Sequence, residues 1–147
     1  MTHPDHQTPE LGIPDRRTPD RQTPDRQTPD RQTLGRLGED AAVLAYAAAG
    51  LRPVARRWRR AEGELDLVLR RDDLLVFCEV KARRGRRCGL PEEAVGPRRL
   101  ARLRRVVRRY LHEEPPRGVQ HFRFDVAAVE FAPDGGGLSV RLLRGVG

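Results

Sequence analysis

The spacing of apolar positions along the chain predicts two helices. Residues 34–49 have apolar positions at helical spacing. The expected buried stripe of this first helix is Leu37, Ala41, Leu44, Ala45 and Ala48. Thr33 is its expected N-cap and Gly50 the residue after its end. A second helix is predicted to begin at Gly96-Pro97 and to end before Pro115-Pro116, with a core face of Leu100, Leu103, Val107, Tyr110 and Leu111.

Shorter apolar runs between turn-forming residues predict five strands. They cover residues 52–59, 64–70, 74–81, 122–131 and 138–143, with turns at Glu62-Gly63 and Asp72-Asp73. The resulting order, α-β-β-β-α-β-β, is typical of an α/β or α+β domain in which a sheet is flanked by helices.

Residues 1–33 differ from the rest in composition. Proline recurs at every fifth position from Pro4 to Pro29, and from Thr18 the unit Thr-Pro-Asp-Arg-Gln occurs three times. A segment with so few apolar residues cannot offset the entropy lost on ordering. We therefore expect a disordered or polyproline-like tail, followed by one folded domain at residues 34–147. A tether, a partner-binding segment and a repeat without function remain alternatives for the tail.

Composition excludes several protein classes. The longest apolar run, residues 41–50, is far shorter than the roughly 20 residues of a membrane-spanning helix. Cys78 and Cys88 are the only cysteines, which excludes a disulfide scaffold. No apolar segment of the secretory-signal type occurs at the N-terminus, so a cytoplasmic protein is expected.

The net charge of +8 belongs to the predicted domain, because residues 1–33 carry a net charge of −1. Of the 29 basic residues, 28 are Arg and one is Lys, at position 81. The arginines cluster in the second helix, in the stretch after Lys81 and around Trp58. Such clusters suit contacts with nucleic-acid phosphates, although a solvated face or a GC-rich gene gives the same pattern. The candidates for nucleic-acid binding are Arg83, Arg84, Arg86, Arg87, Arg98, Arg99 and Arg102.

Pairing across the predicted hairpin brings charged residues together. If the turn is centred on Asp72-Asp73, Asp66 lies opposite Glu79, and Glu64 lies opposite Lys81. The alternate positions form an apolar face that should pack on a helix: Leu65, Leu67, Leu69, Val76, Cys78 and Val80. Opposed carboxylates destabilise a sheet unless a cation lies between them. An all-oxygen site of this kind suits Mg²⁺ or Mn²⁺.

Lys81 projects from the same face as Glu79. An ammonium group there can orient an attacking water and stabilise charge on a phosphate. The alternative is a surface ion pair between Glu64 and Lys81, worth about 0–1 kcal/mol, and this pairing is the expected role of Glu64. Glu39 lies in the first turn of the first helix, where an acidic side chain interacts favourably with the helix dipole. Asp125 lies on a strand and is expected to be a structural hydrogen-bonding residue.

Three segments together resemble a known family. They are Gly38-Glu39-Asp40-Ala41-Ala42, Gly63-Glu64-Leu65-Asp66-Leu67-Val68 and Val76-Phe77-Cys78-Glu79-Val80-Lys81-Ala82-Arg83. In order and spacing they resemble the YraN-like family of bacterial proteins, which is similar to PD-(D/E)xK nucleases and to Holliday-junction resolvases. The resemblance implies a restriction-endonuclease-like mixed sheet. It also implies metal ligands at Asp66, Glu79 and the Val80 carbonyl, a catalytic Lys81, and Glu39 as an additional catalytic acid.

The lead hypothesis is thus a Mg²⁺- or Mn²⁺-dependent nuclease that hydrolyses structured or branched DNA. One alternative is a non-catalytic nucleic-acid-binding module on the same fold. Another is an interaction scaffold in which the proline-rich tail binds partners. Analogy with the resolvases allows a homodimer.

Overall fold

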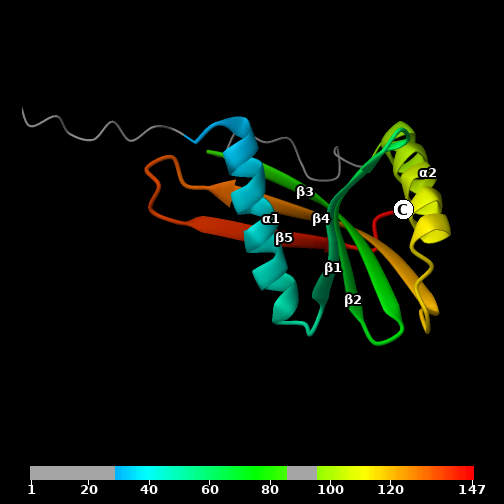
Figure 1. The fold of residues 1–147 in the computed structure, drawn as a ribbon. Coiled ribbons are helices and arrows are strands. Elements are labelled where there is room, and N and C mark those ends of the chain that lie inside the picture. Colours follow the sequence, from blue (N-terminus) through cyan, green and yellow to red (C-terminus); the bar gives the residue numbers. More distant parts are fainter. Residues whose placement is uncertain (1–28, 86–95) are drawn as a thin grey trace, which may run out of the picture.

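The structure is a computed structural model that describes residues 29–85 and 96–147. The elements are α1 (Arg31–Ala47), β1 (Arg52–Arg60), β2 (Gly63–Arg71), β3 (Leu74–Arg84), α2 (Pro97–Glu113), β4 (His121–Phe131) and β5 (Leu138–Arg144). The strands form one sheet in sequence order, with β3 parallel to β4 and the other neighbours antiparallel. The predicted α/β class and element order are confirmed (Figure 1).

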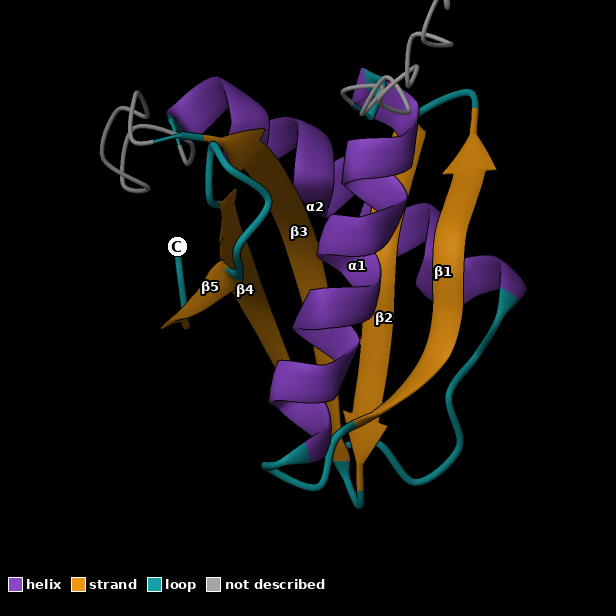
Figure 2. Cartoon of the chain, turned by 90° about the vertical axis from the view of Figure 1, so that its left-hand side faces the viewer, coloured by secondary structure: helices purple, strands orange, loops and turns teal. Residues whose placement is uncertain are grey.

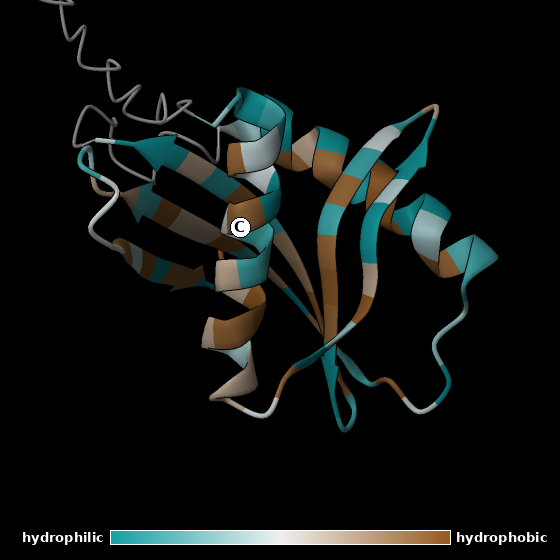
Figure 3. Ribbon diagram, turned by 60° about the vertical axis from the view of Figure 1, so that its left-hand side comes forward, coloured by the Kyte–Doolittle hydropathy of each residue, from teal (hydrophilic) through white to brown (hydrophobic). Residues whose placement is uncertain are grey.

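The two helices lie on opposite faces of the sheet (Figure 2). On one face Ala42 and Tyr46 of α1 pack with residues such as Leu67 and Val76. On the other face α2 packs against a second cluster, made of Leu65, Val68, Leu75, Phe77, Val106, Val107 and Tyr110. Hydrophobic segments accordingly run along the central strands in Figure 3. The expectation of a single apolar hairpin face was wrong, because both faces of β2 and β3 are buried.

Leu65 departs from the predicted alternation. It was expected beside Leu67 and Leu69, but it belongs to the cluster under α2. At this point in β1, Arg57 has a left-handed φ of 48°, a conformation that is rare for non-glycine residues and interrupts a regular pleat. The β1–β2 pair curves toward α2 there (Figure 1), and Leu65 packs in the cluster under α2.

The first helix begins earlier than predicted. Asp30, not Thr33, is its N-cap, because an Asp30 carboxylate oxygen accepts a hydrogen bond from the Thr33 backbone N–H at 2.7 Å. This hydrogen bond lowers the pKa of Asp30. Residues 31–33, assigned above to the tail, are therefore helical. The predicted disorder of the rest of the tail concerns residues 1–28, which lie outside the described residues.

The buried stripe of α1 is also rotated from the predicted one. Gly38, Glu39, Ala41, Ala42 and Tyr46 are buried, whereas Leu37 and Leu44 are 44% and 74% exposed. The reason is close packing on β3: a Cβ on Gly38 would lie 2.5 Å from the Ala82 Cβ. Small residues let α1 approach the sheet, and this brings Glu39 down to it.

A buried carboxylate connects α1, β4 and the C-terminal end of β5. Asp125 is fully buried and accepts hydrogen bonds from the Tyr46 hydroxyl at 2.8 Å and from the Gly145 N–H at 3.0 Å. Two Arg123 nitrogens also donate to it, each at 2.8 Å. The expectation that Asp125 is structural is confirmed. In the described part of the chain, no helix is long and apolar enough to cross a membrane.

Candidate active site

The sheet divides where the predicted acids lie. The β2–β3 ladder runs from Arg71↔Leu74 to Leu67↔Cys78, which confirms the predicted register over that stretch. Beyond it, β2 continues to pair with β1 at Leu65, and β3 with β4 at Glu79. Asp66 and Glu79 are the next positions after the last rung. We call this point of divergence the fork.

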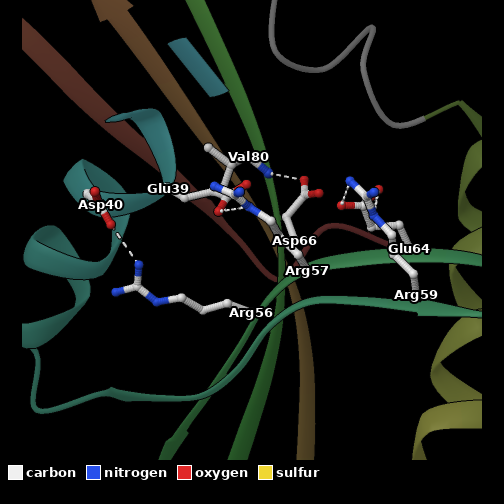
Figure 4. Close-up of polar contacts among 8 residues, drawn as sticks. All are labelled: Glu39, Asp40, Arg56, Arg57, Arg59, Glu64, Asp66 and Val80. Carbon is white, nitrogen blue, oxygen red and sulfur yellow. Dashed lines mark hydrogen bonds and ion pairs between the residues drawn. The ribbon is translucent and has the colours of Figure 1, made fainter. Parts of the chain in front are cut away.

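An acidic side chain replaces the backbone pairing at the fork. An Asp66 carboxylate oxygen accepts a hydrogen bond from the Val80 backbone N–H at 2.8 Å (Figure 4). This contact satisfies a donor that has lost its strand partner, and it holds the Asp66 side chain beside β3. Asp66 therefore lies between two strands that no longer pair with each other.

A cleft of about 560 Å³ opens at the fork. We call it the acid cleft. Its polar lining combines strand residues, Glu64, Asp66, Glu79 and Lys81, with α2 residues, Arg98, Arg99 and Arg102. Leu65, Cys78, Val80, Leu103 and Val106 supply the apolar lining. The structure thus brings three of the four predicted catalytic residues to one cleft, together with three of the predicted nucleic-acid-binding arginines.

Two cations contact the Glu79 carboxylate. Lys81 Nζ lies 2.9 Å from Oε1, and Arg99 Nε donates to Oε2 at 2.6 Å. Arg99 also contacts Oε1 through a second guanidinium nitrogen, so its contact is bidentate. The Glu79 side chain is only 18% exposed. Charge-assisted contacts of this kind fix the carboxylate in place and neutralise it.

Burial also perturbs the pKa values of Asp66 and Lys81 in the cleft. Desolvation raises the pKa of Asp66 above its usual value, against the lowering effect of the Val80 hydrogen bond and of the Lys81 and Arg99 charges. Desolvation likewise lowers the pKa of Lys81, and the Arg83 charge lowers it further. Perturbed groups that share a cleft are typical of functional sites.

Glu39 reaches the fork from the opposite face of the sheet. The Arg57 Nε donates to its carboxylate at 2.8 Å, which makes a largely buried ion pair between α1 and β1 (Figure 4). Burial raises the pKa of Glu39, and the charges of Asp66 and Glu64 act in the same direction. Glu39 is therefore close enough for the charges of Asp66 and Glu64 to affect its pKa, although Glu39 is not among the residues that line the cleft.

The expected Glu64–Lys81 ion pair is wrong. Glu64 contacts Arg59 on the neighbouring strand β1, with an Nε–Oε2 distance of 3.0 Å (Figure 4), while Lys81 contacts Glu79. The reason is the fork: Glu64 still pairs with Arg59 in the β1–β2 ladder, whereas β2 has left β3 at this level.

The remaining predicted phosphate-binding arginines follow Lys81. Arg83 and Arg84 are exposed at the end of β3. Arg86 and Arg87 lie outside the described residues. The assignment of all these arginines to nucleic-acid binding stays a prediction.

The donor set at the fork suits one class of metal ion. Among the described residues, no group of three or more His, Cys, Asp or Glu side chains is arranged to hold a metal. Asp66 and Glu79 nevertheless both line the cleft. Val80, which lies between Glu79 and Lys81 in sequence, lines it as well. Mg²⁺ binds proteins through one or two carboxylates, completing its shell with waters and substrate phosphates. Two carboxylates and a backbone carbonyl are the oxygen ligands that Mg²⁺ or Mn²⁺ would take at this cleft.

Sequence reasoning missed the ion pair between Arg57 and Glu39. Only part of a signal was available, because the Glu62-Gly63 turn sets the register of β1 and β2 but does not place Glu39 of α1. Counting back from Arg60↔Gly63 places Arg57 at the level of Asp66. It also missed the direct contact between Arg99 and Glu79, since nothing in a helix of many arginines distinguishes one that faces an acid.

Comparison with known proteins agrees with this region of the chain. The profile described as "Uncharacterised protein family UPF0102" matches residues 38–129, which include α1 from Gly38 and the whole cleft. A UPF0102 protein of Frankia casuarinae is 47% identical over 112 residues, covering 76% of this chain and 93% of that protein. A UPF0102 protein of Symbiobacterium thermophilum is 48% identical over 105 residues, covering 69% and 86%.

Proposed function

The chain belongs to the uncharacterised protein family UPF0102, and since that name states no activity, we propose one from the acid cleft: a metal-dependent nuclease that hydrolyses phosphodiester bonds of structured or branched DNA. The observation that carries the proposal is the convergence of Asp66, Glu79 and Lys81 at the fork, below the arginines of α2. The resemblance to PD-(D/E)xK nucleases supports it.

Each group has a chemical task. Asp66, Glu79 and the Val80 carbonyl would hold Mg²⁺ or Mn²⁺. Such an ion lowers the pKa of a water ligand and polarises a phosphate. The Lys81 ammonium orients the attacking water and stabilises the charge that develops on the phosphate oxygens. Arg99 and Arg102 would bind the non-bridging oxygens of the substrate phosphate. Arg99 would reach these oxygens after it leaves Glu79. Glu39 acts from the other face as a further acid near the fork.

The apolar side of the cleft strengthens these interactions. Leu65, Leu103 and Val106 exclude water from one side of the acids, and charges interact more strongly where water is excluded. The N-terminal end of α2, which supplies Arg98 and Arg99, adds its helix dipole to the positive potential. A phosphodiester is thus attracted to the place where the acids and Lys81 lie.

Incubation with Mg²⁺ or Mn²⁺ and a panel of linear, flapped, forked and four-way-junction DNAs tests the proposal. We expect cleavage of at least one branched substrate, and its loss in Asp66→Asn and Lys81→Ala. Arg141→Gln is a matched control, because this exposed arginine lies on β5, away from the cleft. Absence of cleavage by the parent, or cleavage that survives both substitutions, would contradict catalysis at this site.

One observation favours a second candidate, a non-catalytic nucleic-acid-binding module. Lys81 and Arg99 both contact the Glu79 carboxylate and neutralise its charge. In that case no product forms with any metal, and Asp66→Asn binds DNA at least as tightly as the parent because it removes a negative charge. Binding assays on the same variants therefore separate the two candidates.

A further inference from the structure

The outer surface of α2 carries a second concentration of positive charge beside the acid cleft. A shallow groove there is lined by Arg98, Ala101, Arg104, Arg105 and Arg108. We call its four arginines the arginine ridge; all four are exposed. At 100° per residue these positions form one continuous stripe along the helix. Arg98 lines both the groove and the acid cleft, so the two surfaces are continuous.

The ridge arginines differ from the other arginines of α2 in their partners. Arg99 contacts Glu79, and Arg109 contacts Glu113 at 2.6 Å. Within the described residues, the ridge arginines make no ion pair. Like charges four residues apart oppose helix formation by about 0.2–0.5 kcal/mol a pair. The pairs Arg98–Arg102 and Arg104–Arg108 have this spacing and make no ion pair among the described residues, so an anionic partner would stabilise the helix.

The surroundings of the ridge identify the class of anion. A membrane surface would need exposed apolar side chains beside the charges, but the exposed large apolar residues of the described chain, Leu37, Leu44, Val54, Phe122 and Leu138, all lie outside α2. A single strand would need exposed aromatic rings on which bases stack. Tyr110 is buried and packs edge-on against Trp58 at 5.3 Å. The half-buried Trp58 ring is in turn covered by the Arg60 guanidinium, 4.3 Å from the ring centroid, so neither ring is open for base stacking and contacts with a phosphate backbone remain.

We propose that the arginine ridge binds the phosphate backbone of a DNA duplex that extends from the acid cleft along α2. The proposal rests on the proposed function, since it assigns the duplex arm of the same substrate. From Arg98 to Arg108 the ridge is about 15 Å long at 1.5 Å per residue. That length matches about four to five base pairs of B-form DNA at 3.4 Å each.

The test is the salt dependence of DNA binding by the full chain. Fluorescence anisotropy without divalent metal compares a 20-base-pair duplex with one of its strands. The ridge variant is the triple substitution Arg104→Gln, Arg105→Gln, Arg108→Gln. The control variant is Arg52→Gln, Arg141→Gln, Arg144→Gln, three exposed arginines of the edge strands that remove the same charge.

For the duplex, loss of three phosphate contacts should reduce the slope of log affinity against log salt by about 2.7, and affinity at 0.15 M salt by about 100-fold. The control variant should keep the parent slope, and metal binding should be unchanged in the ridge variant. Equal losses in the two variants, or a larger loss for the single strand, would overturn the ridge proposal while parent cleavage stands. A parent that neither binds nor cleaves DNA refutes the proposed function and the ridge together.

Discussion

Replacing Arg99 by glutamine should strengthen metal binding and weaken catalysis at the same time. In the free protein the Arg99 guanidinium contacts both Glu79 oxygens. A cation that binds Glu79 must therefore displace Arg99. Glutamine removes the competing charge but keeps a polar side chain of similar reach. The displaced Arg99 would bind the substrate phosphate. The same substitution therefore removes a contact with substrate and should weaken catalysis.

The magnitude follows from the exposure of the pair. The Arg99 side chain is 44% exposed and that of Glu79 18%, so solvent screens the interaction. Exposed pairs contribute about 0.2–1 kcal/mol, and the bidentate geometry places this one near the upper end. Removal of about 1 kcal/mol of competition corresponds to roughly fivefold tighter metal binding, since 1.4 kcal/mol is a factor of ten.

Titration calorimetry with Mn²⁺ in the absence of nucleic acid measures this change. Arg102→Gln is the matched control: it removes one positive charge from the same cleft, but Arg102 makes no ion pair within the described residues. The difference between the two variants isolates direct competition from long-range electrostatics. If Arg99→Gln binds Mn²⁺ no more tightly than Arg102→Gln does, Arg99 does not compete for Glu79. Glu79→Gln should abolish the difference.

Three other substitutions or conditions test separate parts of the molecule. Lys81→Arg keeps the charge but replaces a compact ammonium by a planar group, so we expect about a 100-fold loss of cleavage with unchanged DNA binding; full activity would exclude the proposed role. Asp125→Asn should lower the free energy of unfolding by about 2–3 kcal/mol in urea titrations, because it leaves the partly buried Arg123 without its counter-charge; the exposed Asp134→Asn should cost little. Burial raises the pKa of Cys78 to about 12 and raises that of Tyr46 as well. Their thiol and hydroxyl ionise first in the unfolded chain, so the stability they contribute is present below pH 9 and is lost as the pH rises toward 12. Urea midpoints should fall over that range, and less steeply in Tyr46→Phe; a flat profile would contradict the assignment.

The register of the acids could be predicted because a short turn determines it. Asp72 adopts a left-handed φ of 52°, which aspartate tolerates better than most residues. Every rung from Arg71↔Leu74 to Leu67↔Cys78 follows from that turn. The positions of Asp66 and Glu79 at the end of this ladder therefore depend on local counting along two short strands, which sequence alone permits.

The rotation of α1 could not be predicted in the same way. Apolar periodicity favoured Leu37 and Leu44 as core residues, since large side chains bury the most area. The actual contact is set by the distance between helix and sheet, and Gly38 against Ala82 makes that distance short. Tyr46 then reaches Asp125, 79 positions away in sequence. Neither constraint is visible in the helix sequence, because both depend on what lies opposite.

The sequence left the ion-pair partners of the acids ambiguous, because the chain contains so many arginines. The chain has 28 arginines and 21 acids, so most acids have several arginines within reach. The fork decides which cation each acid contacts. It separates Glu64 from Lys81, so that Glu64 contacts Arg59 instead. It also leaves Glu79 accessible to Arg99. A sheet that kept its ladder through these positions would have favoured the predicted Glu64–Lys81 pair.

The contacts at Glu79 suit a lysine, the only one of the chain, at position 81. Arg99 approaches both carboxylate oxygens, as a planar guanidinium prefers, whereas Lys81 approaches Oε1 alone. A second guanidinium at position 81 would compete with Arg99 for the same two oxygens and would fill more of the cleft. An ammonium occupies one oxygen and leaves two N–H donors for a water or a phosphate oxygen. A lysine at this position therefore suits the proposed mechanism, in which Arg99 would leave Glu79 for a substrate phosphate and Lys81 would contact the attacking water.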